Sequence, residues 1–194
     1  VTAMSNSSLT DGPKLKEFEK KFARFTNSKF SVGVSNATSA LLLSLNAIGI
    51  QKGDEIIIPD MTFIATSSAV ILSGGIPVLA DIKKDDLTIS PESIERSITK
   101  KTKAIIVVHF AGTPCNMNRI KKIARKNNLK IIEDCAHAIG TFYKKRHVGS
   151  IGDVGCFSFY PTKNITTFEG GMIITNNKKI FEYTKKARNH GITK

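Results

Sequence analysis

Long apolar runs are absent from this chain of 194 residues, and that absence argues against a membrane-spanning segment. No stretch reaches the roughly 18 consecutive apolar residues that a membrane-spanning helix needs. The first residues, VTAMSNSSLTDGP, are polar and contain no apolar core of the kind found in a secretion signal. We therefore expect a cytoplasmic protein with no membrane partner.

Cysteine is also scarce, with only Cys115, Cys135 and Cys156 in the chain. An odd number of cysteines without paired spacing argues against a disulfide framework and gives no sign of a metal site. Cys135 and Cys156 stand among apolar residues, which predicts that they are small core side chains. We expect no metal.

Acidic residues are few: 16 Asp and Glu face 29 Lys and Arg, for a net charge of +13. Such an excess can indicate a nucleic-acid partner. Here, however, the lysines are scattered over predicted helix faces and loops, and no basic segment alternates with aromatic residues as a base-stacking surface would. The pattern predicts no nucleic-acid partner and a general attraction for phosphorylated ligands.

Helical and strand-like segments alternate along most of the chain, with short turns between them. The expected helices cover residues 13–26, 40–48, 64–73, 91–97, 117–127 and 177–189, and the expected strands cover residues 30–34, 55–59, 76–80, 103–109, 129–133, 155–160 and 172–175. Several of these strands are continuously apolar, as strands covered on both faces are. The pattern predicts an α/β fold, a three-layer sandwich with a mostly parallel central sheet. No internal repeat or interdomain linker interrupts it.

Polar residues follow many of the predicted strands at their carboxyl ends, where ligands collect in sheets of this type. They are Ser35–Ser39, Asp60–Phe63, His109, Asp134 and Ser158–Lys163. The first of these segments precedes a predicted helix, whose unpaired amides can bind an anion, with hydroxyls from Thr38 and Ser39. An ordinary helix cap explains the same residues. Together the segments predict one ligand site on one edge of the sheet.

Lys163 and Asp134 are the residues of this edge that most clearly suggest a catalytic role. Lys163 lies between an apolar run and a tight turn, where partial desolvation would free its amine to form a Schiff base. A plain loop lysine is the alternative. Asp134 ends an apolar strand, where a carboxylate needs a cation or a strong donor, such as a protonated heterocycle. A helix-capping aspartate is the alternative.

Six motifs, in order, give the sequence a specific resemblance: FEKKFARF, VSNATSALLLSL, GDEIIIPDMTFIAT, DCAHAIGTFY, GDVGCFSFYPTKNITTFEGGM and RNHG. The chain resembles the DegT/DnrJ/EryC1/StrS family of sugar aminotransferases, which depend on pyridoxal 5′-phosphate (PLP) and belong to the fold-type I aminotransferases. The resemblance covers nearly the whole chain. It implies that residues 13–194 form the PLP-binding large domain, after a polar lead-in over residues 1–12.

The resemblance implies a role for individual residues. Lys163 matches the lysine that forms the Schiff base with the cofactor aldehyde, and Asp134 matches the aspartate that keeps the pyridine nitrogen protonated. Phe63 matches the aromatic residue that stacks on the cofactor ring, although a core phenylalanine is the alternative. Thr38, Ser39 and Ser158 match residues that hold the cofactor phosphate. His137 matches a position close to the phenolic oxygen of the cofactor.

The implied reaction transfers an amino group, usually from glutamate, to a keto sugar linked to a nucleotide, in two stages with ping-pong kinetics. Lys163 serves as general base and acid. Family members that act as dehydratases carry histidine in its place, so Lys163 favours amine transfer. A non-sugar keto substrate, as in the relatives that make aminohydroxybenzoate, is the alternative. The family's shared active site also implies a homodimer.

The chain departs from the family pattern in two places. Phe168 stands where many relatives carry a small residue, and we expect it to pack beside the turn rather than shape the sugar pocket. The resemblance also implies that the domain is incomplete at both ends and lacks a small C-terminal domain. An inactive cofactor-binding fragment is therefore the alternative to an active enzyme, and we expect little turnover from these 194 residues alone.

Overall fold

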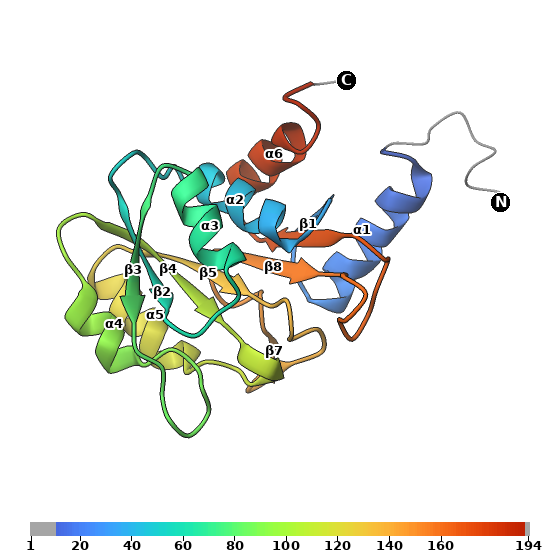
Figure 1. Cartoon of the computed structure of the whole chain (residues 1–194). Coiled ribbons are helices and arrows are strands. Elements are labelled where there is room, and N and C mark those ends of the chain that lie inside the picture. Colours follow the sequence, from blue (N-terminus) through green and yellow to red (C-terminus); the bar gives the residue numbers. More distant parts are fainter. Residues whose placement is uncertain (1–10, 193–194) are drawn as a thin grey trace.

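A computed structural model describes residues 11–192. Most of the polar lead-in predicted for residues 1–12 therefore lies outside the described residues. Within them, helices and strands alternate as predicted (Figure 1). The helices are α1 (Pro13–Phe25), α2 (Ala37–Ala47), α3 (Ala65–Leu72), α4 (Pro91–Ser97), α5 (Met117–Lys126) and α6 (Lys178–Ala187), with a short 3-10 turn η1 (Phe110–Gly112).

The central sheet of the described residues has seven strands in the order β1-β9-β8-β5-β4-β2-β3. They are β1 (Phe30–Val34), β2 (Glu55–Pro59), β3 (Ile76–Ala80), β4 (Thr102–Val108), β5 (Lys130–Asp134), β8 (Val154–Ser158) and β9 (Gly171–Thr175). All neighbours pair in parallel except β9, which runs antiparallel to both β8 and β1. The prediction of a mostly parallel sheet is confirmed.

Apolar side chains on the two faces of the sheet form two separate cores, because alternate residues of a strand point to opposite faces. One core contains Ile105 and Ile131, and it packs against α1, α4 and α5. The other contains Ile106 and Ile132, and it packs against α2, α3 and α6. The predicted three-layer sandwich is therefore correct.

Local signals in the sequence explain several helix starts. Pro13 opens α1, which places Phe18 and Phe22 on one face, and the Phe22 ring lies 5.0 Å from Phe157. Asn36 caps α2 and Asn116 caps α5 through their side-chain oxygens. Helix α2 begins at Ala37, three residues before the predicted start, because Asn36 takes the capping position.

The three cysteines are free and buried, which confirms the prediction of core side chains for Cys135 and Cys156. Burial raises the pKa of Cys135 to about 12, so its thiol stays protonated at neutral pH. No group of His, Cys, Asp and Glu residues suited to a metal ion occurs between residues 11 and 192. In the same range, no helix has both the length and the apolar character to cross a membrane.

Two features were not predicted. A small two-stranded hairpin, β6 (Phe142–Tyr143) with β7 (Arg146–His147), lies between β5 and β8. Two-residue strands are too short to show an alternating pattern. The strand predicted over residues 155–160 is β8, which ends at Ser158, and the two residues after it begin the loop that carries Lys163.

Candidate cofactor site

The carboxyl ends of β1, β2, β4, β5 and β8 meet at one edge of the sheet, since these strands run in the same direction. Strand β9 begins at this edge because it is reversed. The predicted site residues Thr38, Ser39, Phe63, Asp134 and Ser158 all lie at or just beyond these strand ends. The topology therefore brings them to one side of the molecule, as the sequence predicted.

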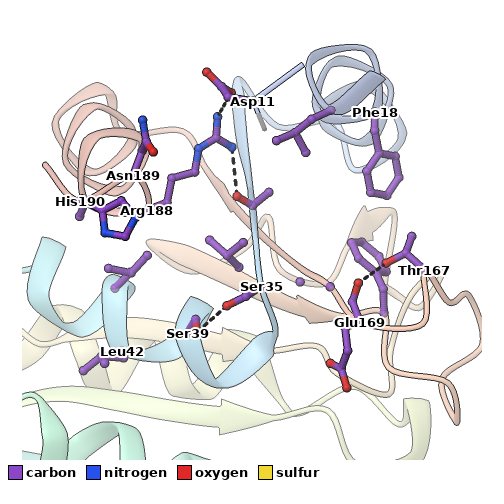
Figure 2. Close-up of a pocket in the computed structure, with 18 residues that line it drawn as sticks. Asp11, Phe18, Ser35, Ser39, Leu42, Thr167, Glu169, Arg188, Asn189 and His190 are labelled. Atoms are coloured by element: carbon purple, nitrogen blue, oxygen red, sulfur yellow. Dashed lines mark hydrogen bonds and ion pairs between the residues drawn. The ribbon is translucent and has the colours of Figure 1, made fainter. Parts of the chain in front are cut away.

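The turn from β1 into α2 forms a small polar cradle, which we define as residues 35–39. The Asn36 side chain accepts a hydrogen bond from the Ser39 N–H at 2.8 Å, and the Ser35 and Ser39 hydroxyls lie 3.0 Å apart (Figure 2). Thr38 is half-buried in the first helical turn. The helix-cap interpretation is thus correct for Asn36, and an anion would meet Ser39 through its hydroxyl rather than its amide.

Gly171 supports the cradle from behind. A Cβ atom on this glycine would lie 2.5 Å from the Asn36 carbonyl carbon and 2.6 Å from its oxygen, so only glycine fits here. Gly171 pairs with Ser158 across β8 and β9, and Ser158 is buried with its hydroxyl accepting from the Tyr160 N–H at 3.4 Å. The sheet therefore carries Ser158 to the cradle through Gly171.

Asp134, the last residue of β5, has a buried side chain with few partners. Among the described residues, its carboxylate accepts one hydrogen bond, from the Ala136 N–H to Oδ1 at 3.0 Å. Burial raises the pKa of Asp134, and the nearby charges of His137, His109 and Lys163 oppose that rise. A buried carboxylate with spare acceptor capacity is suited to a protonated ring nitrogen.

Lys163 and His137 lie within electrostatic reach of Asp134. Burial lowers the pKa of His137, and the positive charge of Lys163 lowers it further, while Asp134 opposes the change. Lys163 is half-buried in the loop between β8 and β9, where its N–H donates to the Tyr160 carbonyl at 2.9 Å. The predicted turn at Lys163 is confirmed, and Asp134, His137 and Lys163 lie close enough to influence one another's charge.

Phe63 and Phe168 are both exposed to solvent rather than packed in the core. Phe63 is 75% exposed, so its alternative role as a core side chain is excluded. Phe168 is 83% exposed and adopts a positive φ of 64°. The prediction that Phe168 packs beside the turn is therefore wrong. Glycine adopts this backbone conformation most easily, so the phenylalanine is strained here.

His109 was predicted among the polar residues of the edge, but the structure buries it completely beside Glu133 and Cys115. Its ring is fully buried and donates from Nε2 to Glu133 at 3.0 Å, while its Nδ1 accepts from the Cys115 N–H at 3.1 Å. Glu133 also accepts from the N–H groups of Gly149, Ile151 and Gly152. Sequence reasoning missed Glu133, although alternation along β5 places it opposite Asp134.

A groove of about 700 Å³ opens beside the cradle rather than over Asp134 and Lys163. It is lined by apolar residues of α1 and α2 and by the end of α6, with Ser35 and Ser39 at its base (Figure 2). Arg188 crosses one side of this groove. Arg188 is the first residue of the RNHG motif, but the sequence predicted no role for it.

These residues fit PLP. The cradle supplies hydroxyls and a helix N-terminus for a phosphate, and the buried Asp134 carboxylate supplies an acceptor for a ring N–H. Lys163 supplies an amine on the same edge.

A family model for the DegT/DnrJ/EryC1/StrS aminotransferases matches residues 1–194. The chain belongs to this family. The family is PLP-dependent, so the cofactor fit found above agrees with the family assignment. SpsC from Bacillus subtilis, a spore coat polysaccharide biosynthesis protein, is 44% identical over 186 residues, which are 96% of this chain and 48% of SpsC.

Solved structures of similar proteins share the fold. NtdA from Bacillus subtilis, solved with the bound cofactor PMP, has a TM-score of 0.87 at 35% identity, over 91% of this chain and 40% of NtdA. DesI, solved in the presence of its TDP-sugar product, has a TM-score of 0.90 at 35% identity, over 94% of this chain and 46% of DesI. The chain spans about half the length of the curated relatives it matches.

Proposed function

We propose that this chain is the cofactor-binding part of a PLP-dependent aminotransferase that moves an amino group from glutamate to a keto sugar linked to a nucleotide. The observation that carries the proposal is the buried carboxylate of Asp134 within electrostatic reach of Lys163, on the edge that also holds the cradle. The family assignment and the TDP-sugar of DesI support a sugar substrate. The glutamate donor rests on the family resemblance.

When bound, PLP supplies an electron sink that stabilises the carbanion formed at the donor carbon. Asp134 holds the proton of the ring nitrogen, and its burial strengthens that interaction by excluding water. Lys163 Nζ would hold the cofactor through its aldehyde group, and the same amine would take and return the proton of the donor carbon. Thr38, Ser39 and Ser158 hold the phosphate.

Two further residues complete the proposed site. The exposed ring of Phe63 is available to cover one face of the cofactor ring. His137, whose pKa is lowered by burial, serves as a neutral hydrogen-bonding group for the ring oxygen. The excess of 29 basic over 16 acidic residues favours the approach of a diphosphate-bearing substrate. We also propose a homodimer, on the family resemblance.

The test is a titration of the purified chain with PLP, followed by visible absorption. We expect a yellow band that Lys163→Ala abolishes and that Lys144→Ala, a matched change in the β6–β7 turn, leaves unchanged. Adding glutamate should bleach the band and release 2-oxoglutarate, and a TDP-linked keto sugar should restore it. A band that survives Lys163→Ala would refute the role of Lys163.

Turnover is a separate measurement. Because the chain matches only about half of its relatives' length, we expect cofactor binding with little steady-state transfer from the 194 residues alone. Rapid multiple turnover by this chain would contradict that expectation. Bleaching by glutamate without restoration by any keto sugar nucleotide would favour a non-sugar acceptor.

A further inference from the structure

Arg188, at the C-terminal end of α6, connects parts of the chain that are far apart in sequence. Its guanidinium, only 10% exposed, pairs with Asp11 at 2.7 Å and with Glu19 of α1. It also donates to the Gly33 carbonyl oxygen of β1 at 3.0 Å. Figure 2 shows Arg188 extending across the groove toward Asp11. One side chain therefore links α6, α1 and β1.

Glu19 binds the same residue of β1, on the edge that faces Arg188. Its Oε1 accepts from the Gly33 N–H at 2.8 Å, so Arg188 and Glu19 together engage both backbone polar groups of Gly33. Strand β1 lies at the edge of the sheet and pairs only with β9 among the described strands. An edge strand presents a row of unpaired polar groups, and this charged pair binds them where a further strand would.

Gly33 permits this arrangement because α1 approaches it closely. A Cβ atom at this position would lie 2.6 Å from Leu15 Cδ1 of α1. The cradle begins only two residues later, at Ser35, and Gly171 lies against the backbone of Asn36. The first residues of the cradle are therefore flanked by Gly171 and by the pair of Arg188 and Glu19.

We propose that Arg188 and Glu19 are positioning residues for the phosphate of the cofactor, which they act on through Gly33 and the cradle. The inference rests on the proposed function. Arg188 lines the same groove as Ser35 and Ser39, but two carboxylates already engage its guanidinium. It therefore acts by holding β1 in register rather than by binding the phosphate itself. Loss of the pair would let the cradle shift while Asp134 and Lys163 keep their places.

The test compares the affinity of the apo chain for PLP with its affinity for pyridoxal, which lacks the phosphate. We expect Arg188→Gln to weaken PLP binding by about tenfold, the lower end of losses from second-layer contacts. Pyridoxal binding should stay within about twofold of wild type. Arg188→Lys and Glu19→Gln keep part of the contact, so they should fall between wild type and Arg188→Gln.

Arg119→Gln is the matched control, because Arg119 pairs with Glu92 between α5 and α4, on the face of the sheet opposite α2. It should leave both affinities unchanged. Circular dichroism and urea midpoints show whether each variant is folded. If Arg188→Gln does not fold, the PLP and pyridoxal affinities of Arg188→Lys are compared with those of wild type instead. Equal loss of PLP and pyridoxal affinity would overturn the inference, as would no loss of either.

The result also separates this inference from the proposed function. A wild-type chain that binds pyridoxal and PLP equally well has no phosphate preference, and the inference fails while the role of Lys163 stands. If neither aldehyde produces a yellow band, the proposed function fails for this chain. In that case, the binding of inorganic phosphate is measured from the amide NMR shifts of residues 35–39. The inference then requires weaker phosphate binding by Arg188→Gln than by wild type or Arg119→Gln.

Discussion

Glu133 and Asp134 are neighbours in sequence and are both buried, yet the structure treats them in opposite ways. Glu133 accepts hydrogen bonds from His109 and from three backbone N–H groups. Asp134 accepts one bond from the described residues, from Ala136. Burial alone would raise the pKa of both; the donors hold the pKa of Glu133 below its usual range, while that of Asp134 stays raised.

The difference separates a carboxylate whose acceptor capacity is used within the fold from one whose capacity is largely left open. The donors around Glu133 tie the loop at residues 149–152 to β5, so its charge is used within the protein. Asp134 keeps acceptor capacity that a ligand can use, at a cost to the apo chain. Strand alternation explains how two such environments can adjoin, since the side chains point to opposite faces.

The strongest test of the comparison is the removal of Glu133. Glu133→Ala leaves three backbone N–H groups and His109 without their acceptor, so we expect a loss of about 3–5 kcal/mol in the free energy of unfolding. Urea unfolding of the apo chain measures it. A loss below about 1 kcal/mol would show that water replaces the carboxylate and that Glu133 is not a structural anchor.

Asp134→Asn should have the converse effect. We expect the affinity for PLP to fall by about 10- to 100-fold, because the ring nitrogen loses its charged partner. The free energy of unfolding of the apo chain at neutral pH should stay unchanged or rise, because a buried charge with few donors is removed. Absorbance titration measures the affinity for PLP, and urea unfolding of the same preparation measures stability. A clear loss of stability would show that Asp134, like Glu133, stabilises the fold.

The smallest expected effect is in the pH dependence of stability, with opposite signs for the two residues. The pKa of Glu133 is lowered on folding, so its contribution is present above the ordinary glutamate pKa and is lost as pH falls toward the lowered value. The pKa of Asp134 is raised on folding, so stability is lost as pH rises from the ordinary aspartate pKa to the raised value.

Comparing apo wild type with Glu133→Gln and Asp134→Asn between about pH 3 and pH 7 isolates these terms. The advantage of wild type over Glu133→Gln should shrink as pH falls. The advantage of Asp134→Asn over wild type should grow as pH rises. Parallel slopes for the two variants would show that the two carboxylates share one environment.

Much of the fold could be predicted from the sequence because its signals are local. Continuous apolar runs mark the strands, and Pro13 and Gly49 mark the start of one helix and the end of another. The edge that gathers the site residues also follows, since parallel strands end on one side. The motif resemblance led to the same lysine and aspartate that the structure places within reach of each other.

The rest depends on contacts between distant residues. Arg188 and Glu19 are 169 positions apart, and nothing in either local sequence reveals the pair. His109 follows an apolar strand exactly as a site residue would, and only the packing of Cys115 and Glu133 around it shows that it is buried. The exposure of Phe168 was likewise hidden, because the loop's backbone conformation and not its composition determines where the ring points.

The reversal of β9 gives the lysine-bearing loop an unusual independence. The loop leaves the sheet at Ser158 and re-enters it at Gly171, and these two residues pair directly across β8 and β9. Its two ends are thus fixed side by side by the sheet, and the buried Phe159, whose N–H donates to the Gly170 carbonyl at 2.9 Å, extends this fixed base by one residue. Segments of different length and sequence can therefore be accommodated around Lys163 without a change in the pairing of β8 with β9.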